Sequence, residues 1–266
     1  IASLVQNHTL ISMSDIVRAY LAKESIPNGA VAVTFDDGFH NNVTNAWPIL
    51  EKYGVPATVY LATGYIGSDR VMRMDTIEAI VFLSGLPKLV IEVGKEELSF
   101  DLDTMINRRE SFFGLKKLCK ELPRDAAEKM IIDLSNQAPR CEMFQRPEYR
   151  FMTWEDARKM AQSELIELGA HTVDHFPLST LDQDEIEYQI KGSIQAIESE
   201  LNQRCIHFAY PEGRACDYDQ RAIDFLIEEK IFIAPNAVAG TNLCYQINPY
   251  HLNRILVGMD GNLFPF

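Results

Sequence analysis

The sequence lacks the features of nucleic-acid-binding and membrane proteins. Its 25 lysines and arginines are outnumbered by 38 aspartates and glutamates, which gives a net charge of −13 and a pI near 4.9. This acidity argues against a phosphate backbone or an anionic membrane as a partner, because both require clustered basic side chains. The longest apolar run, Val55 to Thr63, is much shorter than the roughly 20 residues of a membrane-spanning helix. We therefore expect no nucleic acid partner and no transmembrane segment.

Cysteine is also scarce. The five cysteines are odd in number, widely spaced and contain no CxxC pair, so neither a zinc knuckle nor a disulfide framework is expected. Free thiols are typical of a reducing compartment, and the sequence starts at Ile1 without a leader-like stretch. We expect a cytoplasmic location, with the cell envelope or periplasm as the alternative if a leader has been removed. No feature of the sequence indicates an oligomeric state.

The hydrophobic pattern alternates between strand and helix periodicity. Short β-branched or apolar segments predict strands at 30–35, 57–63, 165–170, 205–210, 231–235 and 254–257. Helical spacing predicts helices at 42–53, 154–162, 182–201 and 219–230. Strands separated by helices of this length imply parallel βαβ units. The expected fold is an α/β barrel, closed or nearly closed, with residues 1–266 forming a single catalytic domain.

The pattern changes between about residues 68 and 150. Segments 108–122 and 125–138 show helical spacing with charged outer faces. We interpret this region as a helical insertion rather than a second catalytic unit.

Three polar segments follow predicted strands: TFDDG at 34–38, HTVDH at 171–175 and FAYPEG at 208–213. Barrel enzymes place catalytic groups at this end of their strands. Two adjacent carboxylates repel each other in a buried position unless a cation offsets their charge. His171 and His175 with one carboxylate would give the three ligands and open position of a catalytic zinc, where a bound water has a pKa of about 7. The second aspartate would then be free to act as a base.

Each motif alone has a simpler explanation, since a DD pair often caps a helix and HxxxH is common. Together, these residues resemble the polysaccharide deacetylases of the NodB homology group, also called carbohydrate esterase family 4. TFDDG matches the first family motif letter for letter, and His171, Thr172 and His175 match the second, H[ST]xxH. FAYPEG is similar to the FAYPxG variant of the third motif. The resemblance covers about residues 27–67 and 151–260.

The resemblance implies a distorted (β/α) barrel and a hydrolase of non-peptide carbon–nitrogen bonds. Members remove N-acetyl groups, and some remove O-acetyl groups, from amino-sugar polymers or their precursors, so a carbohydrate or lipid-linked sugar is the expected partner. The family pattern makes Asp36 the base and makes Asp37, His171 and His175 the metal ligands. Zn²⁺ is the expected ion, with Co²⁺, Ni²⁺ and Mn²⁺ as alternatives. The backbone N–H of Tyr210 is the candidate to help hold the oxyanion.

The third motif departs from the family pattern at one position. Many relatives carry an arginine there that orients the base, but this sequence has Ala209. Arg214 or Arg254 could supply the guanidinium instead. Arg254 is also, with Tyr210, a candidate for contacts with the substrate.

The last family motif departs more strongly. It normally supplies a histidine as general acid, whereas the comparable stretch here, ILVGMD at 255–260, has none. His251 is the nearest candidate for this catalytic role. The two departures leave open a second hypothesis, a catalytically degenerate domain that binds a glycan or a metal. The same ligand types also form the facial triad of non-haem iron oxygenases, but strand and helix alternation does not suit that class.

Overall fold

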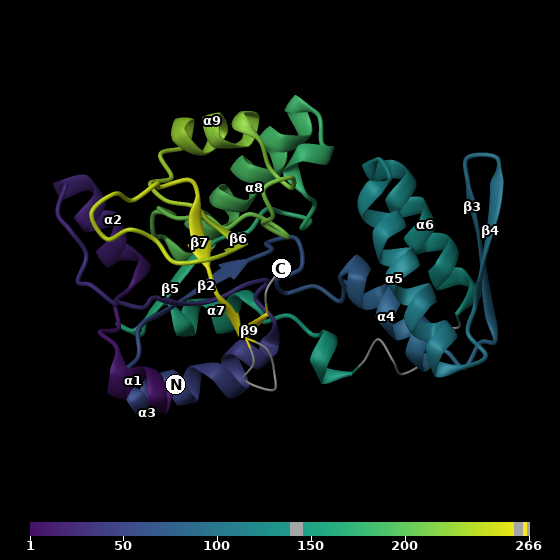
Figure 1. Ribbon diagram of the computed structural model, residues 1–266, viewed down its shortest axis with the longest axis horizontal. Coiled ribbons are helices and arrows are strands. Elements are labelled where there is room, and N and C mark those ends of the chain that lie inside the picture. The colour runs from purple at the N-terminus through teal and green to yellow at the C-terminus, as the bar shows by residue number, and fades with distance from the viewer. Residues whose placement is uncertain (139–145, 258–262, 265–266) are drawn as a thin grey trace. The chain divides into compact units, whose positions relative to one another are not determined.

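The computed structural model describes residues 1–138, 146–257 and 263–264. The chain divides into two compact units, Ile1–Ser68 with Phe151–Phe266 and Asp69–Arg150 (Figure 1). Each unit is described by itself below. Among the residues described, no helix combines the length and apolar character needed to span a membrane.

The first unit is built on parallel strands. Its sheets contain β1 (Val33–Phe35), β2 (Ala57–Leu61), β5 (Ile166–Ala170), β6 (Pro235–Ala239) and β7 (Leu252–Arg254). β2 pairs in parallel with both β1 and β5, and β6 pairs in parallel with β7. Single parallel bridges, Ala170 with Phe208 and His207 with Ile233, join these two groups. The strands therefore follow one another in the order β1, β2, β5, the segment at Phe208, β6 and β7.

Helices surround these strands (Figure 1). They are α1 (Ala2–Asn7), α2 (Met13–Ala22), α3 (Trp47–Tyr53), α7 (Trp154–Met160), α8 (Gln183–Leu201) and α9 (Gln220–Glu228), with a π-helical segment at Asn42–Ala46 before α3 and a 3-10 turn at Leu178–Thr180. α8 begins at a capping box of Asp182 and Glu185 and buries Ile186, Ile190 and Ile194. A short antiparallel pair, β8 (Leu256–Val257) and β9 (Leu263–Phe264), follows β7.

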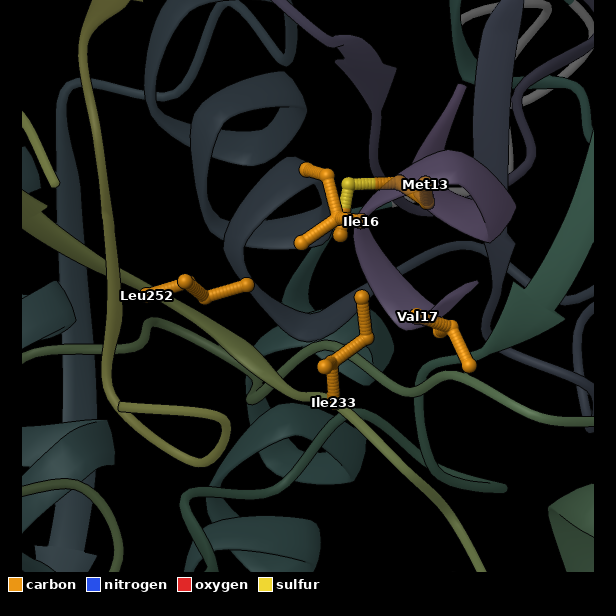
Figure 2. Close-up of a cluster of buried hydrophobic side chains, with 5 residues drawn as sticks. All are labelled: Met13, Ile16, Val17, Ile233 and Leu252. Atoms are coloured by element: carbon orange, nitrogen blue, oxygen red, sulfur yellow. The ribbon is translucent and has the colours of Figure 1, made fainter. Parts of the chain in front are cut away.

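α2 packs against the N-terminal ends of the strands. Met13, Ile16 and Val17 face Ile233 and Leu252 in a buried apolar cluster (Figure 2). This helix begins at a capping box formed by Ser12 and Asp15. Its packing closes this end of the barrel and leaves the opposite end, where the polar motifs lie, for chemistry.

The second unit contains more than helices. It consists of α4 (Arg73–Leu83), α5 (Met105–Glu121), α6 (Arg124–Gln137), a hairpin of β3 (Lys88–Val93) and β4 (Glu96–Asp101), and a 3-10 turn at Pro147–Tyr149. The hairpin was not predicted, although its signal is in the sequence. Leu89 and Ile91 alternate with more exposed neighbours, and Gly94 adopts the positive φ of 66° that a tight turn requires.

Some strands of the first unit differ from the prediction. Segment 205–210, predicted as a strand, forms only the isolated bridges at His207 and Phe208. The strand predicted at 231–235 lies later, as β6, and the one predicted at 254–257 is split between β7 and β8. No ladder joins β7 to β1 within the described ranges. The barrel is thus distorted, and side chains close it where backbone pairing stops.

Candidate active site

The ends of two strands on either side of β2 bring the predicted metal ligands together. Asp36 and Asp37 directly follow β1, and His171 directly follows β5. Both strands pair in parallel with β2, so their C-terminal ends meet at one edge. One ligand atom each from Asp37, His171 and His175 lies within 4.8 Å of the others. The structure therefore contains a possible metal site made by these three residues.

The polar atoms of this group fit a cation. Asp37 Oδ1 lies 3.2 Å from His175 Nε2 and 3.5 Å from His171 Nε2. This oxygen is buried, yet it accepts no hydrogen bond of normal geometry from any residue that the structure describes. A buried carboxylate oxygen without such a bond is costly. Two nitrogens and one carboxylate oxygen are also the donor set of catalytic zinc sites.

The hydrogen bonds and charges around His171 suit it to binding a cation. It is almost fully buried, and its Nδ1 lies 2.7 Å from the carbonyl oxygen of Ala209. A carbonyl only accepts, so Nδ1 carries the hydrogen, and in the neutral ring Nε2 keeps a lone pair that could bind a cation beside Asp37. Burial lowers the pKa of His171, but Asp37 and Asp36 outweigh burial and raise it. The site thus favours positive charge, which a divalent cation would supply.

The backbone around the ligands is strained. Asp37, Thr172 and His175 have φ values of 75°, 63° and 55°, in the left-handed region. Each such non-glycine conformation costs on the order of 1–3 kcal/mol and persists only where neighbours hold it. Gly38, with φ of 81°, lies so close to Ile66 and Leu61 that a Cβ atom would meet them at 2.8 and 2.9 Å. This clustering of strain is typical of functional sites.

Arg254 holds Asp36 by two parallel hydrogen bonds. Its Nη1 and Nη2 atoms donate to Oδ1 and Oδ2 of Asp36, each at 2.8 Å. Its Nε atom donates to the carbonyl of Asn236 at 2.6 Å, and Nη1 also reaches Thr34 Oγ1 at 3.3 Å. Burial would raise the pKa of Asp36, but Arg254 and His171 outweigh it, so the net shift is downward. The carboxylate is therefore both oriented and kept ionised at neutral pH.

The structure shows which of the two candidate arginines, Arg214 or Arg254, binds the Asp36 carboxylate. Arg254 supplies the guanidinium that is missing at Ala209, whereas Arg214 pairs with Asp217. The contacts of Arg254 in the structure are with Asp36, Thr34 and Asn236, and its predicted role in contacting the substrate stays a prediction. The sequence has no signal for this choice, because the two partners lie 218 residues apart.

The backbone N–H of Tyr210, the group predicted to hold the oxyanion, already has a hydrogen-bond partner within the barrel. Its backbone N–H donates to the carbonyl of Pro235 at 3.3 Å, and its hydroxyl donates to the carbonyl of Tyr250 at 3.3 Å. Its ring stacks on Tyr218 with centroids 3.8 Å apart. The N–H is thus engaged by Pro235, the first residue of β6, and its role in holding an oxyanion stays a prediction. The contacts of Tyr210 are those of a packed barrel residue.

His251 lies in a different group from the metal triad. It is exposed, and its Nδ1 is 2.8 Å from the hydroxyl of Tyr218, which also accepts a hydrogen bond from Asn236 at 3.3 Å. The ring of His251 also lies against that of Tyr218, with centroids 5.6 Å apart. The geometry gives no support to its predicted role as general acid.

Comparison with known proteins gives one family. A family model described as polysaccharide deacetylase matches residues 23–227. A 58-residue stretch is 38% identical to the poly-beta-1,6-N-acetyl-D-glucosamine N-deacetylase of Staphylococcus aureus, and an equally long one is 43% identical to the Staphylococcus epidermidis protein of that name. Each match covers 22% of this chain and 20% of the relative. The chain thus spans about a fifth of the length of these curated relatives.

Solved structures with a similar fold include one that is a deacetylase by name. The Streptococcus pyogenes deacetylase PplD, in complex with acetate, is 18% identical with a TM-score of 0.57, over 94% of this chain and 75% of that one. IcaB from Ammonifex degensii is 14% identical with a TM-score of 0.59, over 97% and 82%. At such identities the likeness shows the fold alone. It confirms the predicted distorted (β/α) barrel.

Proposed function

Because the chain belongs to the polysaccharide deacetylase family, we propose that it hydrolyses N-acetyl groups of an amino-sugar polymer or its precursor. O-acetyl groups are a second substrate class for the same site. The observation that carries the proposal is the convergence of Asp37, His171 and His175, with Asp36 held beside them by Arg254. A base and a cation site at one strand edge are what amide hydrolysis by activated water requires.

We place a divalent cation on Asp37 Oδ1 and the Nε2 atoms of His171 and His175. Zn²⁺ is the proposed ion, and Co²⁺, Ni²⁺ and Mn²⁺ are alternatives that the same donors accept. When bound, such an ion would lower the pKa of a water molecule and provide positive charge next to the acetyl carbonyl oxygen. The hydrogen bond from His171 Nδ1 to Ala209 keeps the ring in the orientation and tautomer that binding needs.

Asp36 is the proposed general base. Water adds to the carbonyl carbon and loses a proton to the Asp36 carboxylate, then the C–N bond breaks to release acetate. Asp36 passes its proton to the leaving nitrogen, and the second proton of water is lost by the acetic acid and taken up by the amine, so ammonium and acetate account for all atoms of water. Arg254 donates hydrogen bonds to both oxygens of the Asp36 carboxylate at 2.8 Å. These bonds orient the remaining lone pairs of the carboxylate and restrict the side chain before the reaction, so less conformational entropy is lost during it.

The staphylococcal relatives suggest the substrate to test first. Their names give poly-beta-1,6-N-acetyl-D-glucosamine as the polymer that they act on. We propose that this chain acts on a polymer of β-linked N-acetylglucosamine or on a lipid-linked sugar of the same chemistry. Acetylated chitin oligomers serve as the comparison substrate, since they share the acetamide but differ in linkage.

The test is acetate release from these substrates by the chain reconstituted with Zn²⁺ or Co²⁺. Wild type is expected to release acetate and expose free amines in equal amounts. Asp36→Asn, which keeps the size of the side chain, is the matched control and should lose the activity while still binding metal. Metal binding without acetate release from any acetylated sugar in the panel would overturn the proposal.

One observation favours a second candidate, a domain that binds a glycan or a metal without turnover. His251, the predicted general acid, lies with Tyr218 rather than with the triad. Binding of the deacetylated and acetylated polymers with equal affinity, together with absent acetate release, would support this alternative.

A further inference from the structure

One buried side chain from a helix holds the loop between the two histidine ligands. Gln189 lies in α8 and has a relative exposure of 0%. Its Oε1 atom accepts hydrogen bonds from the backbone N–H groups of Val173, at 3.0 Å, and Asp174, at 2.8 Å. Its Nε2 atom donates to Asp174 Oδ2 at 2.9 Å. Three bonds thus link the helix to the two residues that precede His175.

These contacts fix the orientation of the Gln189 amide. Two backbone N–H donors point at one atom, which must be the carbonyl oxygen because an amide NH₂ group cannot accept from them. The NH₂ group then faces a carboxylate, which accepts its hydrogen. An apolar side chain of similar size would leave two buried N–H groups and the Asp174 carboxylate without these bonds, which is unfavourable.

The loop needs support because its backbone is strained. Thr172 and His175 both adopt left-handed φ values. On one side, Thr63 N–H donates to the carbonyl of Thr172 at 3.0 Å and Gly64 N–H donates to that of Val173 at 2.9 Å. Gln189 holds the loop from the other side, so the strained turn is fastened between the end of β2 and α8.

The two histidines differ in how they are held. His171 has anchors of its own, because its N–H donates to Leu61 at 3.0 Å and its Nδ1 to Ala209 at 2.7 Å. His175 follows directly after the residues that Gln189 binds, and its N–H donates to Thr172 Oγ1 at 3.0 Å within the same turn. A loosened loop should therefore displace His175 more than His171.

We propose that Gln189 is a positioning residue for the cation site. Through Val173 and Asp174 it sets the place of His175 relative to Asp37 and His171, and thereby the affinity and coordination geometry of the bound ion. The inference rests on the proposed function, since it assumes that the triad binds a divalent cation. Partners that orient metal ligands typically contribute 10- to 100-fold to metal affinity.

The test is titration with Co²⁺, whose visible absorption reports coordination geometry, followed by competition with Zn²⁺. Gln189→Met keeps the volume and removes all three bonds. Its matched control is Gln195→Met, on the exposed face of the same helix. We expect about 10- to 100-fold weaker Co²⁺ binding and an altered spectrum for Gln189→Met, and wild-type values for Gln195→Met. Circular dichroism and thermal unfolding establish that both variants are folded.

A polarity swap keeps the inference testable if Gln189→Met does not fold. Gln189→Glu alone sets two carboxylates against each other, whereas Gln189→Glu with Asp174→Asn restores a donor and an acceptor in reversed positions. We expect the double variant to bind Co²⁺ more tightly than Gln189→Glu, with a spectrum closer to wild type. A merely structural role for Gln189 would recover thermal stability without recovering the spectrum.

The outcomes separate this inference from the proposed function. If wild type binds Co²⁺ and Gln189→Met binds it with the same affinity and spectrum, the positioning role is wrong and the metal site stands. If wild type binds neither Co²⁺ nor Zn²⁺, the metal site itself is wrong, and the positioning role falls with it.

Discussion

Two half-buried carboxylates lie in the same barrel, towards opposite ends of its strands, and they have different surroundings. Asp36 follows the C-terminal end of β1 and is held by Arg254. Glu167, near the start of β5, accepts hydrogen bonds from Ser14 N–H at 3.1 Å and Thr58 Oγ1 at 3.2 Å, and lies 3.4 Å from His207 Nε2. Both carboxyl groups have a lowered pKa, in each case against the opposing effect of burial.

The two carboxylates, Asp36 with its partner Arg254 and Glu167 with its partner His207, differ in their surroundings. Next to Asp36 the backbone is left-handed at Asp37, and a buried oxygen of that residue accepts no normal hydrogen bond from the described residues. Glu167 instead sits against α2, whose N-terminal N–H groups favour a negative charge. The Asp36 pair lies beside strained backbone and a possible metal site, which indicates chemistry, whereas the Glu167 pair lies against the N-terminus of a helix, which indicates stability. Barrel enzymes divide their two faces in the same way.

The largest expected effect is at the Asp36 end. Asp36→Asn should lower the rate of acetate release by about 100- to 10,000-fold, because an amide cannot accept the proton from water. Metal binding should be retained, whereas thermal unfolding should shift to lower temperature because Arg254 loses its charged partner. A variant that retains most of the wild-type rate would show that Asp36 is a structural carboxylate like Glu167.

At the other end, Glu167→Gln should act on stability. The contacts with His207 and Ser14 outweigh burial and hold the pKa of Glu167 at about 2, below its ordinary value of 4.5. The stabilisation is therefore present above about pH 4.5 and is lost as the pH falls towards 2. Chemical denaturation should show a free energy of unfolding lower by roughly 2–3 kcal/mol at pH 7, with the gap to wild type closing in acid. Metal affinity should be unchanged, and a gap that is constant with pH would contradict the assignment.

A smaller effect is expected from Arg254→Lys. Lysine keeps the charge but cannot make two parallel bonds to a carboxylate, so Asp36 is less well oriented. We expect kcat to fall about tenfold with KM nearly constant, because the loss affects the reacting water rather than substrate binding. A rise in KM with unchanged kcat would instead favour the substrate-contact role.

The smallest effect is expected from Tyr210→Phe. This change removes only the hydroxyl that donates to Tyr250 and leaves the backbone N–H on Pro235. Acetate release should stay within about twofold of wild type, since one neutral hydrogen bond away from the reacting atoms is lost. A large fall in kcat would show that Tyr210 takes part in the reaction.

The sequence could predict the parts of the site that depend on local order. Asp37 and His171 each follow a strand directly, and parallel pairing brings such positions together, so their meeting is predictable. The pairing of Arg254 with Asp36 depends on how β7 meets β1 across a gap in the barrel, which no local pattern reports. The engagement of the Tyr210 N–H likewise depends on where β6 lies.

Parts of the fold escaped prediction for similar reasons. The segment at 205–210 has the composition of a strand, but in the described structure it pairs only through the bridges at His207 and Phe208. The hairpin of β3 and β4 has alternating buried and exposed side chains and a turn at Gly94. It was missed because the two long helical patterns that follow it led us to interpret the whole region as helical.

The most direct test of the central claim is the metal content of the purified chain after reconstitution with Zn²⁺ and removal of excess ion. Elemental analysis should give about one Zn²⁺ per wild-type chain and per Glu167→Gln chain, and almost none for His171→Ala, because two remaining ligands hold zinc weakly. Wild type that retains no zinc, or His171→Ala that retains as much as wild type, would contradict the account.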